Sequence, residues 1–122
     1  MTASTILVVD DEDSVRLVVG RMLRARGFGL IEARDGREAL QLVQHREQPP
    51  DLILSDVVMP LLTGSELARR IHAERPQQRI LLMSAHAPDV LLSRGLYAEH
   101  LPLLQKPFTA EQLILAVRTA LS

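Results

Sequence analysis

The chain has 122 residues, of which 47% are hydrophobic and 24% are charged, and its formal net charge is -1. This length and balance are typical of one soluble domain with its own core, and the small net charge argues against a surface that binds nucleic acid or an anionic membrane. The chain has no cysteine, which excludes disulfides and thiol chemistry, and no apolar run of the roughly 20 residues that a membrane span needs.

The first unit along the chain is a strand followed by a helix. The apolar run at residues 6–9 predicts a buried strand, and the apolar residues after it recur with the period of an amphipathic helix. We expect Asp13 or Ser14 to cap the start of this helix. Gly27 and Gly29 are expected to close it. Its expected apolar stripe consists of Val15, Val18, Val19, Met22 and Leu23.

The next two units repeat this alternation. A second strand is predicted near residues 28–33, and Asp35 with Glu38 predicts a capping box at the start of a second helix. Residues 51–55 predict a buried strand, and Thr63-Gly64 is expected to open a third helix. The apolar residues of that helix are Leu67, Ala68 and Ile71.

The last part of the chain completes the pattern. Residues 79–83 predict a fourth strand, whereas residues 86–100 show few helical repeats and predict a short or mobile helix. Thr109 and Gln112 predict a capping box ahead of a last helix. Five strand-then-helix units favour a doubly wound parallel sheet with right-handed crossovers, as a single domain over residues 1–122. An eight-unit barrel would need about twice the length.

Polar side chains stand where buried strands should stop. In a parallel sheet the carboxyl ends of the strands lie along one edge, which is where ligands bind. We therefore expect three carboxylates, a hydroxyl and an ammonium to converge at that edge. In chain order they belong to Asp10, Asp11, Asp56, Ser84 and Lys106.

Three carboxylates at one edge repel one another unless a cation joins them. Hard oxygen ligands at an open edge suit Mg²⁺, which takes one or two direct carboxylates and keeps several waters. An Asp pair after a strand can instead act as a helix cap. Here Asp13 is placed to be that cap, which leaves Asp10 and Asp11 for a metal. The separate Asp56 also favours the metal site over a purely structural role.

Four short motifs, in order, carry a resemblance to a known family. They are Val9-Asp10-Asp11, Asp56-x-x-Met59-Pro60-x-x-x-Gly64, Ser84-Ala85 and Lys106-Pro107-Phe108. With them the chain resembles, over its whole length, the receiver domain of two-component response regulators, of the chemotaxis-regulator type. The resemblance implies a flavodoxin-like fold, with a five-stranded parallel sheet in the order 2-1-3-4-5 and five helices. It also implies a signalling domain that is not an enzyme, apart from catalysing its own phosphorylation and dephosphorylation.

The resemblance assigns roles to the residues at the predicted edge. Asp56 would be the nucleophile that takes a phosphoryl group from a phosphohistidine. Asp11 would ligate Mg²⁺ directly and Asp10 through a water. Asp56 and the backbone carbonyl of Val58 would complete the ligand set. Lys106 would pair with Asp56 and then with a phosphoryl oxygen.

The resemblance also assigns a switch and a loop geometry. Ser84 would hydrogen-bond the bound phosphoryl group and move toward it, which favours a second arrangement of the loops. A plain turn cap is the structural alternative for this serine. Pro60, Gly64 and Pro107 are expected to shape the loops, Gly64 through a positive φ. The Lys106–Pro107 bond is expected to be cis.

Some positions around the site depart from the family or modulate it. Leu103 stands where the family often has an aromatic whose rotamer couples to the serine, so coupling by that route is in doubt. Tyr97 or His100 as a replacement is less expected than ordinary packing or exposure. By resemblance His86 and Val58 influence how readily water attacks the acyl phosphate, and a plain exposed His86 is the alternative. We expect dephosphorylation not to be unusually fast.

The expected partner is a histidine kinase or a histidine phosphotransfer domain in the cytoplasm, with no direct role for nucleic acid or membrane. The first ten residues carry no lysine or arginine, so no secretory signal is expected. The family commonly dimerises through its fourth helix, fifth strand and fifth helix, and a homodimer is one option here. Whether five apolar residues of this region form such a surface or fold inward stays open. They are Leu91, Leu92, Tyr97, Leu101 and Leu115.

Two other functions compete with this hypothesis. Residues 11–15 fit the D-x-D-x-[TV] pattern of haloacid-dehalogenase-type phosphatases, with Asp11 as nucleophile, but the chain is short for their core and cap. A receiver-like module that binds partners without being phosphorylated is the second, although every acceptor-site position is present. Residues 104–109 resemble receivers attached to hybrid histidine kinases, so a free-standing regulator and a receiver from a larger protein both stay open.

Overall fold

Strands and helices alternate along the chain in the computed structural model, which describes residues 3–97 and 100–122. The strands are β1 (Thr5–Val9), β2 (Gly29–Ala33), β3 (Leu52–Asp56), β4 (Ile80–Ser84) and β5 (Leu103–Gln105). The helices are α1 (Asp13–Arg24), α2 (Gly36–His45), α3 (Gly64–Glu74), α4 (Pro88–Ser93) and α5 (Ala110–Leu121). Within the described residues no helix has the length and apolar character to cross a membrane.

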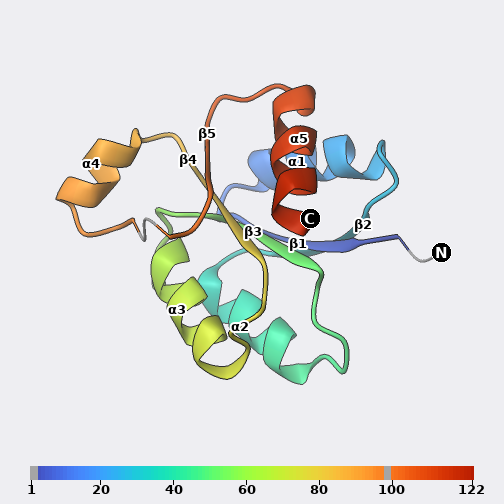
Figure 1. The fold of residues 1–122 in the computed structure, drawn as a ribbon, viewed down its shortest axis with the longest axis horizontal. Helices are drawn as coiled ribbons and strands as arrows, with labels where there is room; N and C mark the ends of the chain where they lie inside the picture. Colours follow the sequence, from blue (N-terminus) through green and yellow to red (C-terminus); the bar gives the residue numbers. More distant parts are fainter. Residues whose placement is uncertain (1–2, 98–99) are drawn as a thin grey trace.

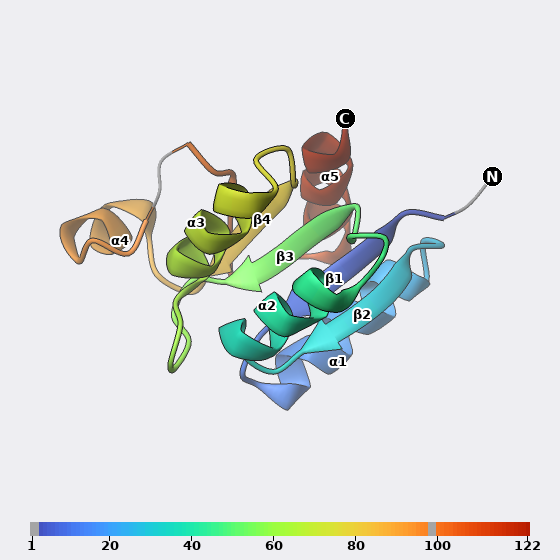
Figure 2. The same cartoon turned by 90° about the horizontal axis from the view of Figure 1, so that it is seen from below.

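The strands form one parallel sheet in the order β2-β1-β3-β4-β5. Figure 1 shows α1 and α5 on one face of this sheet and α2 and α3 on the other, and Figure 2 shows the same layers from below. Both the doubly wound sheet predicted from periodicity and the strand order implied by the resemblance are confirmed. This order puts β1 and β3 side by side at the centre, so the segments that follow them are neighbours.

Two apolar layers sandwich the sheet. Successive residues of a strand point to opposite faces, so Ile6 and Val8 pack under α1 and α5 while Leu7 and Val9 pack against α2 and α3. All of these side chains are at most 1% exposed. A sheet covered on both faces needs strands that are apolar throughout, which explains the unbroken apolar runs of the sequence.

Three of the predicted helix starts are confirmed by side-chain caps. Asp35, Thr63 and Thr109 each accept a hydrogen bond from a backbone N–H three residues on, at 2.8, 3.2 and 3.1 Å. Thr109 and Gln112 form the full reciprocal capping box. At α2 the box is incomplete, because the Glu38 carboxylate accepts from the N–H of Arg34 instead of from the cap residue.

The predicted start of α1 is wrong. The cap position is occupied by Glu12, which makes no side-chain cap, and Asp13 lies inside the first turn, where its carboxylate pairs with Arg16. The predicted stripe is also partly wrong, because Val18 is 48% exposed. The buried face of α1 is narrower than the apolar pattern indicates, and it consists of Arg16, Val19, Gly20 and Leu23.

The fourth helix is short, as predicted: α4 has 6 residues. The apolar residues of this region neither all fold inward nor all form a surface. Leu91 and Leu101 are buried in the core, and Tyr97 is half-buried against it. Leu92 and Leu115 remain 42% and 69% exposed. The region therefore contributes both to the core and to an apolar surface.

The loop between β3 and α3 contains a residue in a conformation that favours glycine. Leu61 has φ 72° and is 67% exposed, so its side chain gains little from packing while its backbone is strained. We expect Leu61→Gly to stabilise the fold by about 0.5–1 kcal/mol, because glycine removes the strain of a Cβ at positive φ. Urea unfolding compared with the original chain measures this difference.

Leu61→Ala is the matched control, because alanine shortens the side chain but keeps the Cβ that causes the strain. We expect this variant to be no more stable than the original chain. Equal stability of the glycine and alanine variants would contradict the assignment of strain to this backbone.

Candidate functional site

The polar groups predicted to converge at the sheet edge do so. Asp10 directly follows β1, Asp56 ends β3, Ser84 ends β4 and Lys106 directly follows β5. Asp10, Asp11 and Asp56 each place a carboxylate oxygen within 4.8 Å of the others. The ammonium of Lys106 lies 3.0 Å from Oδ2 of Asp10 and 3.6 Å from Oδ2 of Asp56. The chemical roles assigned to these residues stay predictions at this point.

Asp10 is fully buried and is held through each of its polar groups. Its N–H donates to the carbonyl of Ala33 in β2 at 3.2 Å, and its carbonyl accepts from Nη1 of Arg16 at 2.6 Å. Oδ1 accepts from the N–H of Glu12 at 2.9 Å, and Oδ2 from Lys106 at 3.0 Å. Both carboxylate oxygens of Asp10 are therefore already engaged by protein donors.

The remaining two carboxylates differ in exposure. Asp11 is exposed, whereas Asp56 is buried, with 7% of its surface accessible. This arrangement offers a cation one accessible and one buried carboxylate beside a third that is locked in place. Oxygen ligands of this kind are those that Mg²⁺ prefers, so the residues present fit the predicted metal.

Burial raises the pKa of the Asp56 carboxyl to about 6, because the charged form loses its hydration. The positive charge of Lys106 works against this shift, and the negative charges of Asp10 and Asp11 add to it. One ammonium does not offset burial and two neighbouring carboxylates together. The site therefore has unsatisfied negative charge when Asp56 is ionised.

Burial alone would lower the pKa of Lys106, but the nearby carboxylates reverse the direction. The charge of Asp56 and the hydrogen bond to Asp10 raise the pKa above its ordinary value. The ammonium is therefore charged at neutral pH and stays between the two carboxylates. The Lys106–Pro107 peptide bond is cis, as expected from the resemblance.

Ser84 and His86 meet beside the site. The Ser84 side chain is buried, and its hydroxyl accepts a hydrogen bond from the N–H of His86 at 3.0 Å. The Ser84 carbonyl accepts the N–H of Lys106 at 2.8 Å, which joins the ends of β4 and β5. His86 is exposed, which agrees with the plain-loop alternative for this residue.

The expectation for Gly64 is wrong. Its φ is not positive, a property that among the described glycines belongs to Gly27 and Gly95. Gly64 is required for space instead, because a Cβ there would lie 2.4 Å from the carbonyl oxygen of Asp56. Its N–H also donates to the carbonyl of Val57 at 2.9 Å. The first turn of α3 thus presses directly on the backbone of the candidate nucleophile.

The residues expected to modulate the site lie at different depths. Leu103 is half-buried and packs against the core on the α2–α3 face, while Val58 is 43% exposed. The Tyr97 hydroxyl donates to the carbonyl of Leu101 at 3.2 Å, which is a packing role, and His100 is exposed. The structure thus gives no aromatic replacement for Leu103 among these described residues.

Two buried polar residues escaped the sequence analysis. Arg16 is 9% exposed and contacts the Asp10 carbonyl, and the Ser55 hydroxyl donates to the carbonyl of Asp56 at 2.9 Å. Arg16 could have been found, because it stands three and seven residues before Val19 and Leu23 and therefore on their face of the helix. Nothing in the sequence distinguishes Ser55 from an ordinary strand residue.

Comparison with known proteins was made with both the sequence and the structure. The family model described as the response regulator receiver domain matches residues 6–118. The chain is 36% identical over 120 residues to the sensor kinase CckA of Brucella abortus, covering 98% of this chain and 13% of that protein. It is 37% identical over 116 residues to the response regulator MprA of Mycolicibacterium vanbaalenii, covering 95% and 49%. The chain thus spans about half or less of the length of these relatives.

A solved structure of the chemotaxis protein CheY4 of Vibrio cholerae superimposes with a TM-score of 0.83 at 30% identity. The match covers 98% of this chain and 99% of that one. Similarity at this level in both sequence and structure extends across the sheet edge described above.

The raised pKa of Asp56 has a consequence for stability. An unfolded aspartate titrates near 3.9 and the folded one at about 6, so the folded state binds the proton more tightly. In EDTA the contribution of Asp56 to stability therefore falls as pH rises from about 4 through about 6. We expect Asp56→Asn to stabilise the metal-free chain at pH 7.5 by about 1–3 kcal/mol.

Urea unfolding at pH 7.5 and at pH 4 measures the effect. The difference between the variant and the original chain should shrink at the lower pH, where the folded Asp56 is already protonated. Asp51→Asn, an exposed aspartate at the opposite end of β3, is the control and should show no such gain. A difference that is independent of pH would contradict the assigned pKa.

Proposed function

The chain belongs to the family of response regulator receiver domains of two-component signalling, and on that premise we propose that it accepts a phosphoryl group on Asp56. The observation that carries the proposal is the convergence of three carboxylates and one ammonium at the edge of the sheet. Asp56 is the buried member of this set, and Lys106 lies 3.6 Å from it. Membership of the family also argues against the phosphatase alternative, in which Asp11 would be the nucleophile.

The proposed reaction is transfer from a phosphohistidine. An Asp56 carboxylate oxygen forms a bond to phosphorus while the bond between phosphorus and the donor imidazole breaks. The imidazole nitrogen leaves with the electron pair of that bond, and the product is an aspartyl phosphate. Lys106 pairs with Asp56 before the reaction and with a phosphoryl oxygen after it, which a compact ammonium can do without changing its position much.

Asp11, Asp56 and the backbone carbonyl of Val58 are the proposed direct ligands of Mg²⁺, and Asp10 acts through a water. The bound cation would shield the negative charge that meets at the reacting carboxylate. The role of Asp10 is supported by its two engaged oxygens, which already accept hydrogen bonds from Glu12 and Lys106. Asp11 is supported as a direct ligand by its exposure.

The proposed switch uses the hydroxyl of Ser84. Because its oxygen accepts the N–H of His86, its own O–H can donate to a phosphoryl oxygen of the product. Drawing Ser84 toward the phosphoryl group then pulls the loop that carries His86. Leu103 is half-buried and has no aromatic ring, so it is proposed as a weaker reporter of the switch than an aromatic. Exposed His86 and Val58 set the access of water, and dephosphorylation that is not unusually fast stays our prediction.

Receiver domains exchange phosphoryl groups with histidine kinases or phosphotransfer domains, and we propose such a partner here. We also propose that residues 1–122 act as a single receiver domain that catalyses only its own phosphorylation and dephosphorylation. Exposed Leu92 and Leu115 support a homodimer through α4, β5 and α5. A free-standing regulator and a receiver within a larger protein, a hybrid kinase or a larger regulator, are both kept as proposals for the whole protein, and the cytoplasmic location stays a prediction.

Intact mass after incubation with acetyl phosphate and Mg²⁺ tests the proposed acceptor. We expect one phosphoryl adduct that requires Mg²⁺ and that is absent from Asp56→Asn. Asp51→Asn is the matched control, because Asp51 lies at the other end of β3, where its carboxylate accepts the N–H of Thr5, and it should keep the adduct.

Two outcomes would change the proposal. An adduct that survives in Asp56→Asn would move the nucleophile to another residue, with Asp11 the first to test. No adduct on folded chain that still binds Mg²⁺, from acetyl phosphate or from phosphorylated histidine donors, would favour a module that works without phosphorylation.

A further inference from the structure

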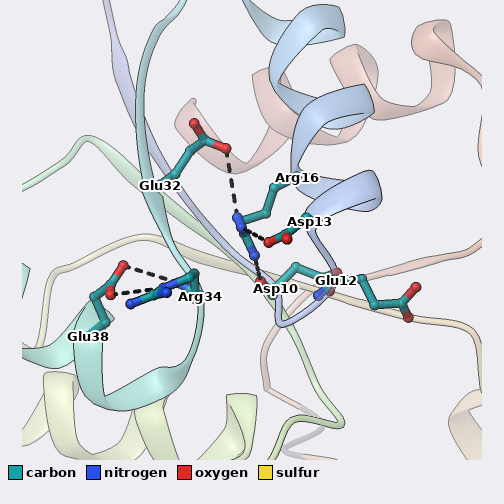
Figure 3. Close-up of polar contacts among 7 residues, drawn as sticks. All are labelled: Asp10, Glu12, Asp13, Arg16, Glu32, Arg34 and Glu38. Atoms are coloured by element: carbon teal, nitrogen blue, oxygen red, sulfur yellow. Dashed lines mark hydrogen bonds and ion pairs between the residues drawn. The ribbon is translucent and has the colours of Figure 1, made fainter.

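A buried guanidinium lies beneath the acidic turn. Figure 3 shows Arg16 of α1 reaching toward the backbone of Asp10, with Asp13 and Glu32 on either side. Nη1 donates to the Asp10 carbonyl at 2.6 Å, Nη2 pairs with the carboxylate of Asp13, and Nε lies 3.8 Å from Oε1 of Glu32 in β2. The Arg16 side chain is only 10% exposed.

Packing alone does not account for an arginine at this position. Arg16 occupies the buried face of α1 in line with Val19 and Leu23, where an apolar side chain would avoid the cost of burying a charge. Its guanidinium instead donates hydrogen bonds to the Asp10 carbonyl in the turn and to Asp13 in the helix, and it lies in an ion pair with Glu32 of the neighbouring strand. Because a guanidinium is planar and rigid, it fixes the direction of its contacts as well as their length.

The contact with Asp10 is transmitted to Asp11 through the backbone. The Asp10 carbonyl and the Asp11 N–H belong to one planar peptide unit, so holding the carbonyl sets the direction in which Asp11 begins. The other end of Asp10 is held by β2, since its N–H donates to the carbonyl of Ala33. The turn is therefore held at two points, and these two contacts set the position of the exposed Asp11 carboxylate.

We propose that Arg16 is a positioning residue, which holds the turn of Asp10 and Asp11 in the arrangement that binds Mg²⁺. The inference rests on the proposed function of the acidic site and adds a residue that touches neither the metal nor the phosphoryl group. Arg16 ties that site to β2 through Glu32, so the strand and the helix together support the turn. Partners of metal ligands commonly matter to affinity by about 10- to 100-fold.

The sign of the effect on Mg²⁺ affinity distinguishes positioning from simple electrostatics. Arg16 is a cation in contact with the backbone of the acidic turn, so removing its charge would by itself tighten the binding of Mg²⁺. Loss of the contact that positions the turn would by itself weaken the binding of Mg²⁺. The two accounts therefore predict opposite changes for Arg16→Met, which keeps an unbranched apolar stem of similar length.

Calorimetric titration of the full chain with Mg²⁺ is the test. We expect the Kd of Arg16→Met to rise by about 10- to 100-fold. Arg16→Lys keeps the charge but lacks the fork, and its Kd should rise by less, though by at least about threefold. Arg34→Met is the matched control, because Arg34 pairs with Glu38 at the adjacent end of β2 and its side chain is 73% exposed (Figure 3). Its Kd should not change.

A readout without metal is available because Lys106 is the only lysine in the chain. Chain grown with ¹³C-lysine gives one side-chain signal, which reports the ion pair between Lys106 and Asp10 directly. In Mg²⁺-free chain we expect this signal to shift in Arg16→Met and to stay in place in Arg34→Met. A role limited to general stability would lower the midpoint of unfolding without moving the signal in folded protein.

An unchanged or lower Kd in Arg16→Met would overturn the proposal. Should that variant fail to fold, an unchanged Kd in folded Arg16→Lys would overturn it as well. The proposed function is judged separately, by the Mg²⁺-dependent adduct on Asp56 of the original chain. If the proposed function fails that test, the titrations can still be interpreted, because they measure the binding of Mg²⁺ alone.

Discussion

Repulsion among the carboxylates of Asp10, Asp11 and Asp56 is the interaction on which the rest of the site depends. Parallel pairing of Val9 with Ser55 brings the residues that follow β1 and β3 to the same level, where their oxygens lie within 4.8 Å. A slip of one residue in this register would send the side chains to opposite faces. Lys106 offsets only part of the negative charge, and the pKa of Asp56 remains raised to about 6. The fold thus holds an anionic site whose own cation does not balance it, which is the condition under which a divalent ion binds well.

The fold keeps this unfavourable arrangement in place by distributing its support. Asp10 is held from β2 through its N–H, from α1 through Arg16 and from the end of β5 through Lys106. Asp56 is held by a different set of contacts, since Gly64 at the start of α3 presses on its carbonyl. Two of the supports of Asp10, Ala33 and Lys106, come from segments distant in the sequence, so the site is complete only when β1, β2 and β5 are assembled in the sheet. The energy that opposes repulsion is the burial of the two apolar layers rather than any single contact in the site.

The architecture could be predicted from the spacing of apolar residues along the sequence. The convergence of the site could be predicted because its polar residues stand where the predicted parallel strands end. The caps at Asp35, Thr63 and Thr109 could be predicted as well, since they depend on residues three positions apart. The errors have a common cause. Asp13 fits a cap locally but pairs with a buried arginine, and Gly64 fits a turn locally but is required by the close approach of the Asp56 carbonyl. In both cases a contact made in the folded chain outweighed the local preference, and the sequence pattern alone did not show that these particular groups meet.

The polar groups at the sheet edge and the exposed apolar side chains differ in how the fold constrains them. Asp10 and Asp56 are buried at the sheet edge, whereas the loop after β3 exposes Val58 and a strained Leu61. Strain of this kind persists only where the surrounding structure imposes it, and here it displays an apolar side chain to solvent next to the acidic site. The same receiver domain is matched within a sensor kinase, of which it covers 13%, and within a response regulator, of which it covers 49%. Under the proposed function, we expect the choice of donor and output to depend on exposed features such as this loop, Leu92 and Leu115. These exposed side chains can change at little cost to the core, whereas Asp10 cannot, because its buried carboxylate, carbonyl and N–H are all engaged.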